Sequence, residues 1–360
     1  MMKINEICTY APKSNIKAGE ATKNGSYMFF TSSSDESKRY CDYQFDGEGI
    51  IMGTGGNATL HYYNGKYAVS TDCVVLLPDK RVNCKYLYYF FLANMQTLEA
   101  GFKGAGLKHT NKNYIGNIEF GDIPSIEKQK QTIEIFDKLS EMIENRKQQL
   151  QQLDELVKAR FVELFGDINT NDKGWETQPL GELCTIVRGG SPRPIENYLG
   201  GDVPWIKIGD ATKGDNVYLH STKEHIIQDG VKKSRMVKSG SLIFANCGVS
   251  LGFARIITFD GCIHDGWLAI EDIDERLDKV FLLQALNQMT DHFRNIAPAG
   301  TQPNLNTAIM KAYVQIIPPM ELQRAYIAFV EQIDKSKFVI QKSLDETQML
   351  FDSLMQEYFG

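Results

Sequence analysis

The chain has 360 residues, of which 42% are hydrophobic and 23% charged, a composition typical of a globular protein with two or three domains. Its net charge of −6 gives no general attraction for nucleic acid, so any phosphate contact requires a local cluster of basic residues. The sequence has neither an apolar run long enough to span a membrane nor an N-terminal signal region, and its seven cysteines are scattered without a CxxC pair. We therefore expect a cytoplasmic protein with reduced thiols and no membrane association.

The first 124 residues alternate short apolar runs with turn signals, which predicts a mixed α+β domain. Asn64-Gly65 favours a hairpin turn. The glycine-rich segment 53–56 either joins two strands, which is its commoner use, or cradles a phosphate. Residues 85–98 favour a buried helix, although their aromatic residues leave a strand open. Strands are expected at 27–30, 49–52, 73–77 and 115–123.

Residues 125–166 carry the pattern of a coiled-coil helix, because apolar residues recur seven positions apart and no proline interrupts them. These apolar residues form a seam, the stripe along which the helix would pack against a partner helix. Arg146 and Arg160 also occupy positions in this seam. They either fix the register of the pair or reach out of the seam to a partner. The apolar seam residues are Phe136, Leu139, Ile143, Leu150, Leu153, Val157 and Leu164.

A polar linker at 167–176 leads to a second domain at 177–318. Residues 188–194 form a loop made rigid by glycine and proline, and residues 232–238 contain the densest basic run of the chain. Strands are expected at 203–208, 241–245 and 254–258, and a helix at 279–294.

The second half of the chain repeats the first half. Pro124 and Gln129 recur 194 positions later as Pro318 and Gln323, and both long helices end in Phe-Gly. Near the start of each copy, INEICT at 4–9 matches LGELCT at 180–185 with a shift of 176, so the second copy holds extra residues. The repeat extends the seam into a second helix at 319–360, with Lys337 at one seam position. Its apolar seam residues are Val330, Ile333, Ile340, Leu344, Phe351, Leu354 and Tyr358.

The linker length decides how these parts are arranged. Ten residues reach at most about 35 Å, whereas the helix that precedes them is roughly 55 Å long. The sequence therefore predicts two repeated α/β domains at opposite ends of an antiparallel two-helix coiled coil, related by a pseudo-two-fold axis.

Three segments of the chain resemble the specificity subunit of type I restriction-modification systems. GGSPRP followed by DVPWIKIGDA (202–211) resembles the opening of a target-recognition domain, and GTQPNLN (300–306) resembles the polar loop that closes one. IIPPMELQRAYIAFVEQID (316–334) resembles the start of the family's conserved helix, and GDIPSIEKQKQTIEIFDKL (121–139) matches it in the first copy. The resemblance covers essentially the whole chain, although the first domain lacks the proline-rich opening and the Pro-Trp strand.

This resemblance implies a non-catalytic subunit that binds double-stranded DNA. Residues 1–124 and 177–318 would be target-recognition domains that each read one half of a bipartite site. The two long helices would set the number of unread base pairs between the half-sites. They would also dock two adenine-N6 methyltransferase (modification) subunits, to which motor-nuclease (restriction) subunits are added. S-adenosylmethionine, ATP and Mg²⁺ are expected on those partners, with no cofactor or metal on this chain.

The sequence lacks the motifs of the catalytic alternatives. No Asn/Asp-Pro-Pro-aromatic clamp for a flipped adenine and no GxxxxGK[ST] phosphate loop occurs. His264-Asp265 has no nucleophile motif beside it, so we expect a local hydrogen bond there. Two alternatives stay open: a protein-interaction scaffold with two ligand-binding domains and no role on DNA, and the recognition half of a fused, type II-like system.

Candidate DNA contacts follow from side-chain chemistry, because Arg and Lys suit guanine edges and phosphates, and Asn and Gln suit adenine. Loops 106–112 and 300–306 are the strongest candidates, since both are polar and occupy equivalent repeat positions. We expect all three tryptophans, Trp175, Trp205 and Trp267, in the core rather than stacked on bases. The candidates in the first domain are Asn57, Lys108, His109, Asn111 and Lys112. Those in the second domain are Arg188, Ser191, Arg193, Lys207, Lys232, Lys233, Arg235, Thr301, Gln302 and Asn304.

Overall fold

The computed structural model describes residues 2–104, 106–212, 214, 216–248, 250–298 and 303–360. Two of the candidate contact residues, Thr301 and Gln302, lie outside these ranges. The chain divides into two compact units: unit 1 comprises Met1–Gln149 and Ile340–Gly360, and unit 2 comprises Leu150–Val339. Each unit therefore contains one mixed α/β domain together with part of both long helices.

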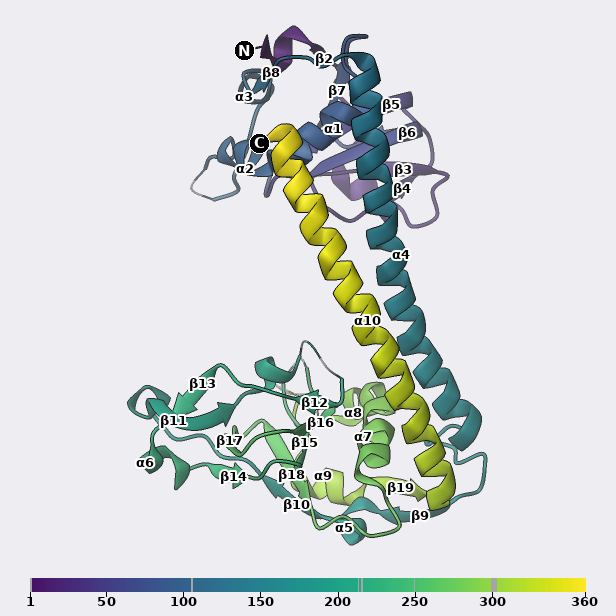
Figure 1. Cartoon of the computed structure of the whole chain (residues 1–360), viewed down its shortest axis with the longest axis vertical. Coiled ribbons are helices and arrows are strands. Elements are labelled where there is room, and N and C mark those ends of the chain that lie inside the picture. Colours follow the sequence, from purple (N-terminus) through teal and green to yellow (C-terminus); the bar gives the residue numbers. More distant parts are fainter. Residues whose placement is uncertain (1, 105, 213, 215, 249, 299–302) are drawn as a thin grey trace. The chain divides into compact units, whose positions relative to one another are not determined.

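Unit 1 is built on a six-stranded sheet with the order β2-β7-β5-β6-β3-β4. The β3–β6 pair is parallel and the other neighbours are antiparallel. Helix α1 (Cys84–Ala93) covers one face of this sheet (Figure 1). Ile50, Leu76 and Leu87 are completely buried there. The strands are β2 (Cys8–Tyr10), β3 (Tyr27–Phe30), β4 (Arg39–Tyr40), β5 (Phe45–Gly53), β6 (Leu60–Val69) and β7 (Cys73–Pro78).

A second, two-stranded sheet closes unit 1, because β1 (Met2–Lys3) pairs antiparallel with β8 (Glu119–Gly121). This pairing holds the start of the chain beside the segment that leads into the first long helix. The remaining short elements of unit 1 are η1 (Ile4–Glu6), η2 (Ala18–Glu20), α2 (Met95–Ala100) and α3 (Lys112–Gly116).

Two local predictions in unit 1 were wrong. Asn64-Gly65 does not form a hairpin turn; it lies inside β6, where Gly65 pairs with Gly47 and Asn64 with Glu48. The turn between β5 and β6 is instead formed by residues 54–59. The strand expected at 115–123 is shorter, because the Asn111 side chain accepts a hydrogen bond from Tyr114 N and starts helix α3, which leaves only β8 extended.

Unit 2 repeats the sheet of unit 1, with the order β10-β18-β15-β16-β12 and one parallel pair, β12–β16. Helix α7 (Lys279–Gln288) covers it as α1 does, over a core that includes Leu242, Phe244 and Phe281. β9 (Glu176–Pro179) pairs with β19 (Val314–Ile317) (Figure 1), as β1 pairs with β8. The predicted repeat is thus confirmed at the level of strand connections. The sheet strands are β10 (Thr185–Arg188), β12 (Tyr218–Leu219), β15 (Leu242–Ala245), β16 (Ala254–Ile257) and β18 (Trp267–Glu271).

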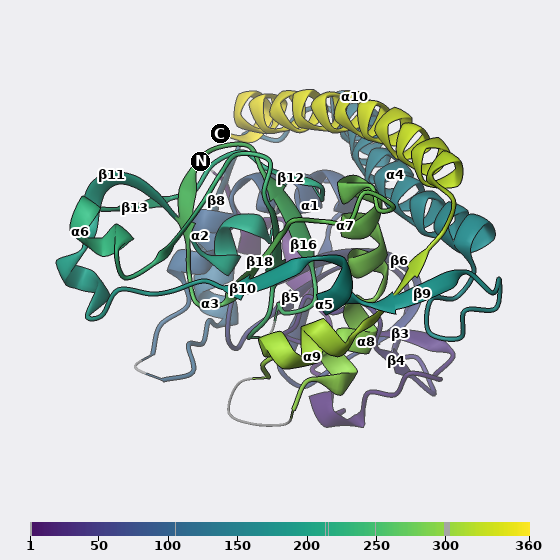
Figure 2. The ribbon, with the colours of Figure 1, turned by 90° about the horizontal axis from the view of Figure 1, so that it is seen from below.

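Unit 2 also has a four-stranded sheet, ordered β13-β11-β17-β14, on its side away from α10 (Figure 1 and Figure 2). Val203, Trp205, Ile226 and Cys262 form its small core. Its strands are β11 (Leu199–Ile206), β13 (Glu224–Ile226), β14 (Arg235–Val237) and β17 (Gly261–Ile263). The other short elements of unit 2 are η3 (Ile195–Asn197), η4 (Ile208–Ala211), α5 (Leu180–Leu183), α6 (Gln228–Val231), α8 (Thr290–Ile296) and α9 (Thr307–Ala312).

The two long helices, α4 (Ile126–Phe165) and α10 (Met320–Phe359), each have 40 residues. In unit 1, the Phe136 ring lies 5.4 Å from Phe351 and 5.9 Å from Tyr358. Further along α4, Arg146 donates a hydrogen bond to Thr347. Because contacts later in α4 fall earlier in α10, the two helices pack antiparallel there.

The same antiparallel contact occurs in unit 2, where Lys337 binds Asp154 and the Phe161 ring lies 5.4 Å from Tyr326. Phe161 and Phe165 are fully buried, whereas the predicted seam residue Leu164 is only half-buried. A straight helix drifts relative to a seven-residue repeat, which moves the seam by one position at this end. The other buried seam residues are Leu139, Ile143, Val157, Val330, Ile333, Leu344 and Phe351; Leu150, Leu153, Ile340, Leu354 and Tyr358 are half-buried.

Candidate nucleic-acid interface

A pair of loops held together by backbone hydrogen bonds lies beyond the end of β5 in unit 1. Thr110 N donates to Thr54 O (3.0 Å), and Gly56 N donates to Lys108 O (2.9 Å). Thr54 N donates in turn to Asp72 O (2.8 Å), which ties the pair to the turn before β7. The glycine-rich segment 53–56 is therefore a turn between strands, as expected, and it holds the candidate loop 106–112 in place.

Unit 2 has the same pair beyond the end of β15. Leu305 N donates to Asn246 O (2.7 Å), and Gly248 N donates to Pro303 O (3.1 Å). Asn246 N donates to Gly266 O (2.9 Å), the counterpart of the Thr54–Asp72 bond. Asn246 is completely buried, and its side chain also donates to Asn304 Oδ1 and to the carbonyl of Leu305 (3.2 Å each). Asn304 is therefore the candidate that this loop pair fixes most firmly.

One glycine in each pair has a backbone conformation that other residues rarely adopt. Gly56 has φ +83° and Gly248 has φ +79°. A Cβ atom added at either position would meet no atom within 4 Å. The requirement for glycine is thus conformational, since a left-handed backbone costs an L-residue about 1–2 kcal/mol.

Beside the loop pair of unit 2, the carboxylate of Asp265 joins several predicted contact residues. Ser191 Oγ donates to its Oδ1 (2.7 Å), and Arg193 Nη2 donates to its Oδ2 (3.2 Å). The backbone carbonyl of Asp265 accepts from Arg188 Nε (3.0 Å), and Arg188 O accepts from Arg235 Nε (3.0 Å). We call Arg188, Ser191, Arg193, Arg235 and Asp265 the arginine cluster.

His264 completes the environment of Asp265. Its Nδ1 accepts from Gly266 N (2.8 Å), which leaves the proton on Nε2, 3.0 Å from Asp265 Oδ1. The two side chains therefore lie in contact, although not as the hydrogen bond that was expected. Burial lowers the pKa of His264, although Asp265 opposes this effect. Burial raises the pKa of Asp265, but the hydrogen bond from Ser191, the nearby His264 and Arg193 outweigh it, so the pKa of this carboxyl is lowered.

The other basic candidates of unit 2 differ in how firmly they are held. Lys207 pairs with Glu224 and lies over the Trp205 ring at 5.6 Å. Lys233 lies over the Tyr198 ring at 4.8 Å and donates to its hydroxyl. Lys232 is 82% exposed and has only a distant pair with Asp229, at 3.5 Å.

The candidates of unit 1 are all exposed, and they lie in or beside the paired loops. Asn57 is in the 54–59 turn, and His109 faces Gly55 across an isolated bridge. Lys112 lies over the Tyr10 ring at 4.9 Å, whereas the side-chain oxygen of Asn111 is used to cap α3. A hollow of about 210 Å³ opens beside these loops, and its lining includes Lys13, Thr54, Thr71, Thr110 and Lys112.

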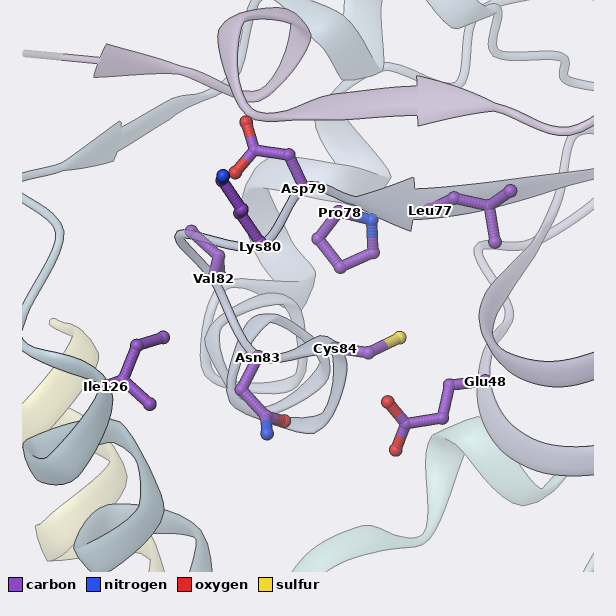
Figure 3. A pocket seen from close by; sticks show the side chains of 9 residues that line it. All are labelled: Glu48, Leu77, Pro78, Asp79, Lys80, Val82, Asn83, Cys84 and Ile126. Carbon is purple, nitrogen blue, oxygen red and sulfur yellow. The ribbon is translucent and has the colours of Figure 1, made fainter.

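A larger hollow of about 320 Å³, where β7 leads into α1, does not belong to this surface (Figure 3). Its polar side chains make structural bonds: Asp79 accepts from Arg81, Asn83 caps α1, and Glu48 accepts from the Tyr62 hydroxyl. We therefore assign it no ligand.

Within the described ranges, no group of three or more His, Cys, Asp or Glu side chains is placed to hold a metal ion. Among the helices of the same ranges, none combines the length and apolar character that crossing a membrane requires. Trp205 and Trp267 are buried and Trp175 is half-buried, as predicted for core residues.

Sequence reasoning missed Asn246 and the central position of Asp265. Asn246 could have been found by aligning the ends of the repeated strands, since GTGG at 53–56 corresponds to ANCG at 245–248. Asp265 carried no such signal, because its partners Arg188, Ser191 and Arg193 lie more than 70 residues earlier in the chain.

Two repeated α/β units with the same pair of polar loops are the arrangement expected of a recognition protein with two related surfaces. The family model described as "Type I restriction modification DNA specificity domain" matches residues 1–155 and 172–347. The chain therefore belongs to the type I restriction-modification DNA specificity family, and it is a DNA sequence-recognition subunit. The alternative of a scaffold with no role on DNA is not supported.

Relatives of this chain come from bacteria and archaea. It is 22% identical over 373 residues to the type I restriction enzyme EcoDI specificity subunit of Escherichia coli, covering 95% of this chain and 82% of that protein. It is 21% identical to the MjaVIII specificity subunit of Methanocaldococcus jannaschii, covering 85% and 76%. A crystal structure of the type I system S subunit from M. genitalium covers 99% of this chain and 95% of that chain with a TM-score of 0.64 and 16% identity, a likeness of fold.

Proposed function

We propose that each unit of this chain reads one half of a bipartite DNA site through its paired loops. Residues 54–57 and 108–112 serve unit 1. Residues 188–193, 246–248, 264–266 and 303–304 serve unit 2. The basic side chains around these loops would contact phosphates and guanine edges, and the amides would contact adenine.

The repeated loop pairing carries this proposal. In both units, three backbone hydrogen bonds hold equivalent loops at the end of the same strand, although the loop sequences differ. A common framework with different loop side chains suits two readers of different half-sites, because contacts to base edges carry the sequence information.

We further propose that the chain has no catalytic activity of its own and assembles with adenine methyltransferase and restriction subunits. The long helices α4 and α10 run through both units, so their length would set the number of unread base pairs between the half-sites. The same helices would dock the methyltransferase subunits, on which S-adenosylmethionine would bind; ATP and Mg²⁺ would be used by the restriction subunits.

Mapping methyl-adenine in DNA from cells that carry this chain and its methyltransferase tests the proposal. The expected motif has two specified parts separated by a fixed number of unspecified base pairs. Changing Lys108 and His109 to Ala should alter one part only, whereas the control Lys80→Ala, on an exposed turn away from the loops, should alter neither. A single uninterrupted motif, or a change in both parts, would contradict the assignment of one half-site to each unit.

A further inference from the structure

An aspartate stands among the basic residues of the unit 2 surface, where it should repel DNA phosphates. Asp265 is only part-exposed; its carboxylate accepts hydrogen bonds from Ser191 and Arg193, and His264 Nε2 lies 3.0 Å from its Oδ1. These two donors, one of them the guanidinium of Arg193, offset part of the charge of this carboxylate. An acidic residue is unfavourable on a surface that binds DNA, so its presence points to a role in orienting the neighbouring arginine side chains.

The bonds to Asp265 leave the recognition atoms of the two exposed arginines available. Arg188 uses its Nε to hold the Asp265 carbonyl, and no bond within the described chain uses its terminal Nη pair. Arg193 uses Nη2 alone, and its side chain is 80% exposed. A guanidinium fixed at one edge keeps its other donors in a known plane, and this lowers the entropy lost when it binds a second acceptor.

The loop that carries these arginines is itself held in place. Arg235 Nε donates to the carbonyl of Arg188, and Ser234 Oγ donates to the carbonyl of Gly190 (2.8 Å). Ser191 is bonded twice, since its Oγ donates to Asp265 Oδ1 and accepts from Asp265 N (3.3 Å). The backbone and one edge of each guanidinium are therefore set before DNA arrives.

We propose that Asp265 is a positioning residue in unit 2: its carboxylate presents Arg193, and its backbone carbonyl presents Arg188, to guanine in the half-site that this unit reads. The two acceptors of guanine in the major groove, N7 and O6, match the paired donors of a guanidinium, whereas phosphate can be held by a flexible lysine without such preparation. The half-site of unit 2 then contains at least one guanine that these arginines read. This inference rests on the proposed function of unit 2 as a half-site reader.

The described part of unit 1 shows no counterpart of this arrangement. Thr71 takes the place of Asp265 in the repeat, and Pro12 takes the place of Arg188. The nearby carboxylate of Asp72 accepts from Ser70 instead. A change at Asp265 should therefore affect one half of the recognition site, and the other half serves as a control within the same molecule.

The test uses the full chain bound to its methyltransferase subunits and a duplex library in which one half-site at a time is randomised. Asp265→Asn should lower the preference for guanine at the position read by Arg193 by roughly 10- to 100-fold, the range of a lost bidentate contact. The bond from Arg188 uses the backbone carbonyl of residue 265 and should remain. Replacing that guanine by 7-deazaguanine, which lacks the N7 acceptor, should weaken binding of the natural chain and add little to the loss in Asp265→Asn. Asp260→Asn is the matched control, since Asp260 also pairs with a basic side chain, Lys238, outside the arginine cluster.

Each outcome decides between the proposals. If the natural complex shows no two-part site, the proposed function fails and the inference fails with it. If it shows such a site without guanine in the unit 2 half, or if Asp265→Asn weakens all sequences alike, the inference alone is overturned and Asp265 acts on phosphate contacts or on folding. Unfolding followed by tryptophan fluorescence checks the last possibility, because all three tryptophans lie in unit 2.

Discussion

Gln129 and Gln323 make the same three hydrogen bonds, although they lie 194 residues apart. Gln129 Nε2 donates to the carbonyls of Arg81 (3.0 Å) and Pro124 (2.8 Å), and its Oε1 accepts from Asn83 N (2.7 Å). The side chain of Gln323 bonds Arg276 O (2.8 Å), Pro318 O (2.7 Å) and Asp278 N (2.8 Å) in the same way. Both glutamines are completely buried. Each one therefore ties the start of a long helix to the start of the helix that covers the sheet.

Removing either glutamine side chain should destabilise its own unit. Gln323→Ala leaves two carbonyls and one N–H buried without partners, which we expect to lower the free energy of unfolding of unit 2 by about 2–4 kcal/mol. Urea unfolding followed by tryptophan fluorescence measures it, because the tryptophans report on unit 2 alone. Gln332→Ala, at an exposed position of the same helix, is the control and should change little. An equal effect of both substitutions would show that the three bonds contribute nothing.

The aromatic contact between α4 and α10 in unit 2 should be a major source of its stability. Phe161 is 1% exposed and packs on Phe165, Phe281 and Tyr326. Phe161→Ala should cost about 3–5 kcal/mol, the usual range for a buried phenylalanine. The neighbouring Val162 is 54% exposed, and Val162→Ala should stay within about 0.5 kcal/mol of the natural chain. Thermal unfolding of the two variants side by side measures the difference, and similar midpoints would contradict the packing described here.

Replacing the left-handed glycines should damage one half-site each. Gly248→Ala forces a Cβ atom into a conformation that costs about 1–2 kcal/mol, so the loop should move away from Pro303 and unit 2 should lose specificity. Gly56→Ala should do the same in unit 1. The control is Gly209→Ala, because Gly209 also has open space around it but no left-handed backbone. Methyl-adenine mapping reads the result; an unchanged motif in Gly248→Ala would mean that this turn does not position base contacts.

The lowered pKa of His264 predicts a pH dependence of the stability of unit 2. Burial favours the neutral imidazole in the folded chain, whereas the unfolded chain takes up a proton at about pH 6.5. Stability is therefore complete above about pH 6.5 and declines as the pH falls below it, because the unfolded state binds more protons. Urea midpoints by tryptophan fluorescence between pH 5 and 8 should show this decline, and His264→Gln should reduce it. His220→Gln, at an exposed position, should leave the slope as it is; a slope equal in all three proteins would assign it to other groups.

Lys232 should contribute to DNA binding without contributing to sequence preference. Its ammonium is exposed and is not held over a ring, in contrast to that of Lys233. Lys232→Ala should weaken binding to all sequences alike and reduce the slope of log affinity against log salt by about 1. Binding measured from low to high salt on cognate and unrelated duplexes tests this, with Lys335→Ala on α10 as the control. A changed half-site motif would instead assign Lys232 to base contacts.

Much of the fold follows from the sequence because it depends on periodic patterns and on the repeat. The seven-residue spacing predicts α4 and α10, and the recurring proline and glutamine at 124–129 and 318–323 predict the equivalence that the hydrogen bonds of Gln129 and Gln323 display. Local signals were less reliable: Asn64-Gly65 is a strong turn signal, yet pairing with Gly47 and Glu48 places it inside a strand. Long-range strand pairing outweighed turn propensity there.

The candidate surface was predicted as a set of residue types and could not be predicted as an arrangement. Arg188, Ser191 and Arg193 were selected for their chemistry, but their common partner Asp265 enters from a distant turn and was expected only to bond its neighbour His264. Asn246 likewise reaches loop 303–305 across more than 50 residues. Such contacts depend on tertiary structure, which one sequence without its relatives does not reveal.

The bonds that join Gly56 to Lys108 and Gly248 to Pro303 use main-chain atoms alone. Side chains at 108–109 and 303–304 can therefore be replaced during evolution without weakening these bonds. Under the proposed function, such replacements would change the DNA sequence that one unit recognises, while the other unit keeps its own.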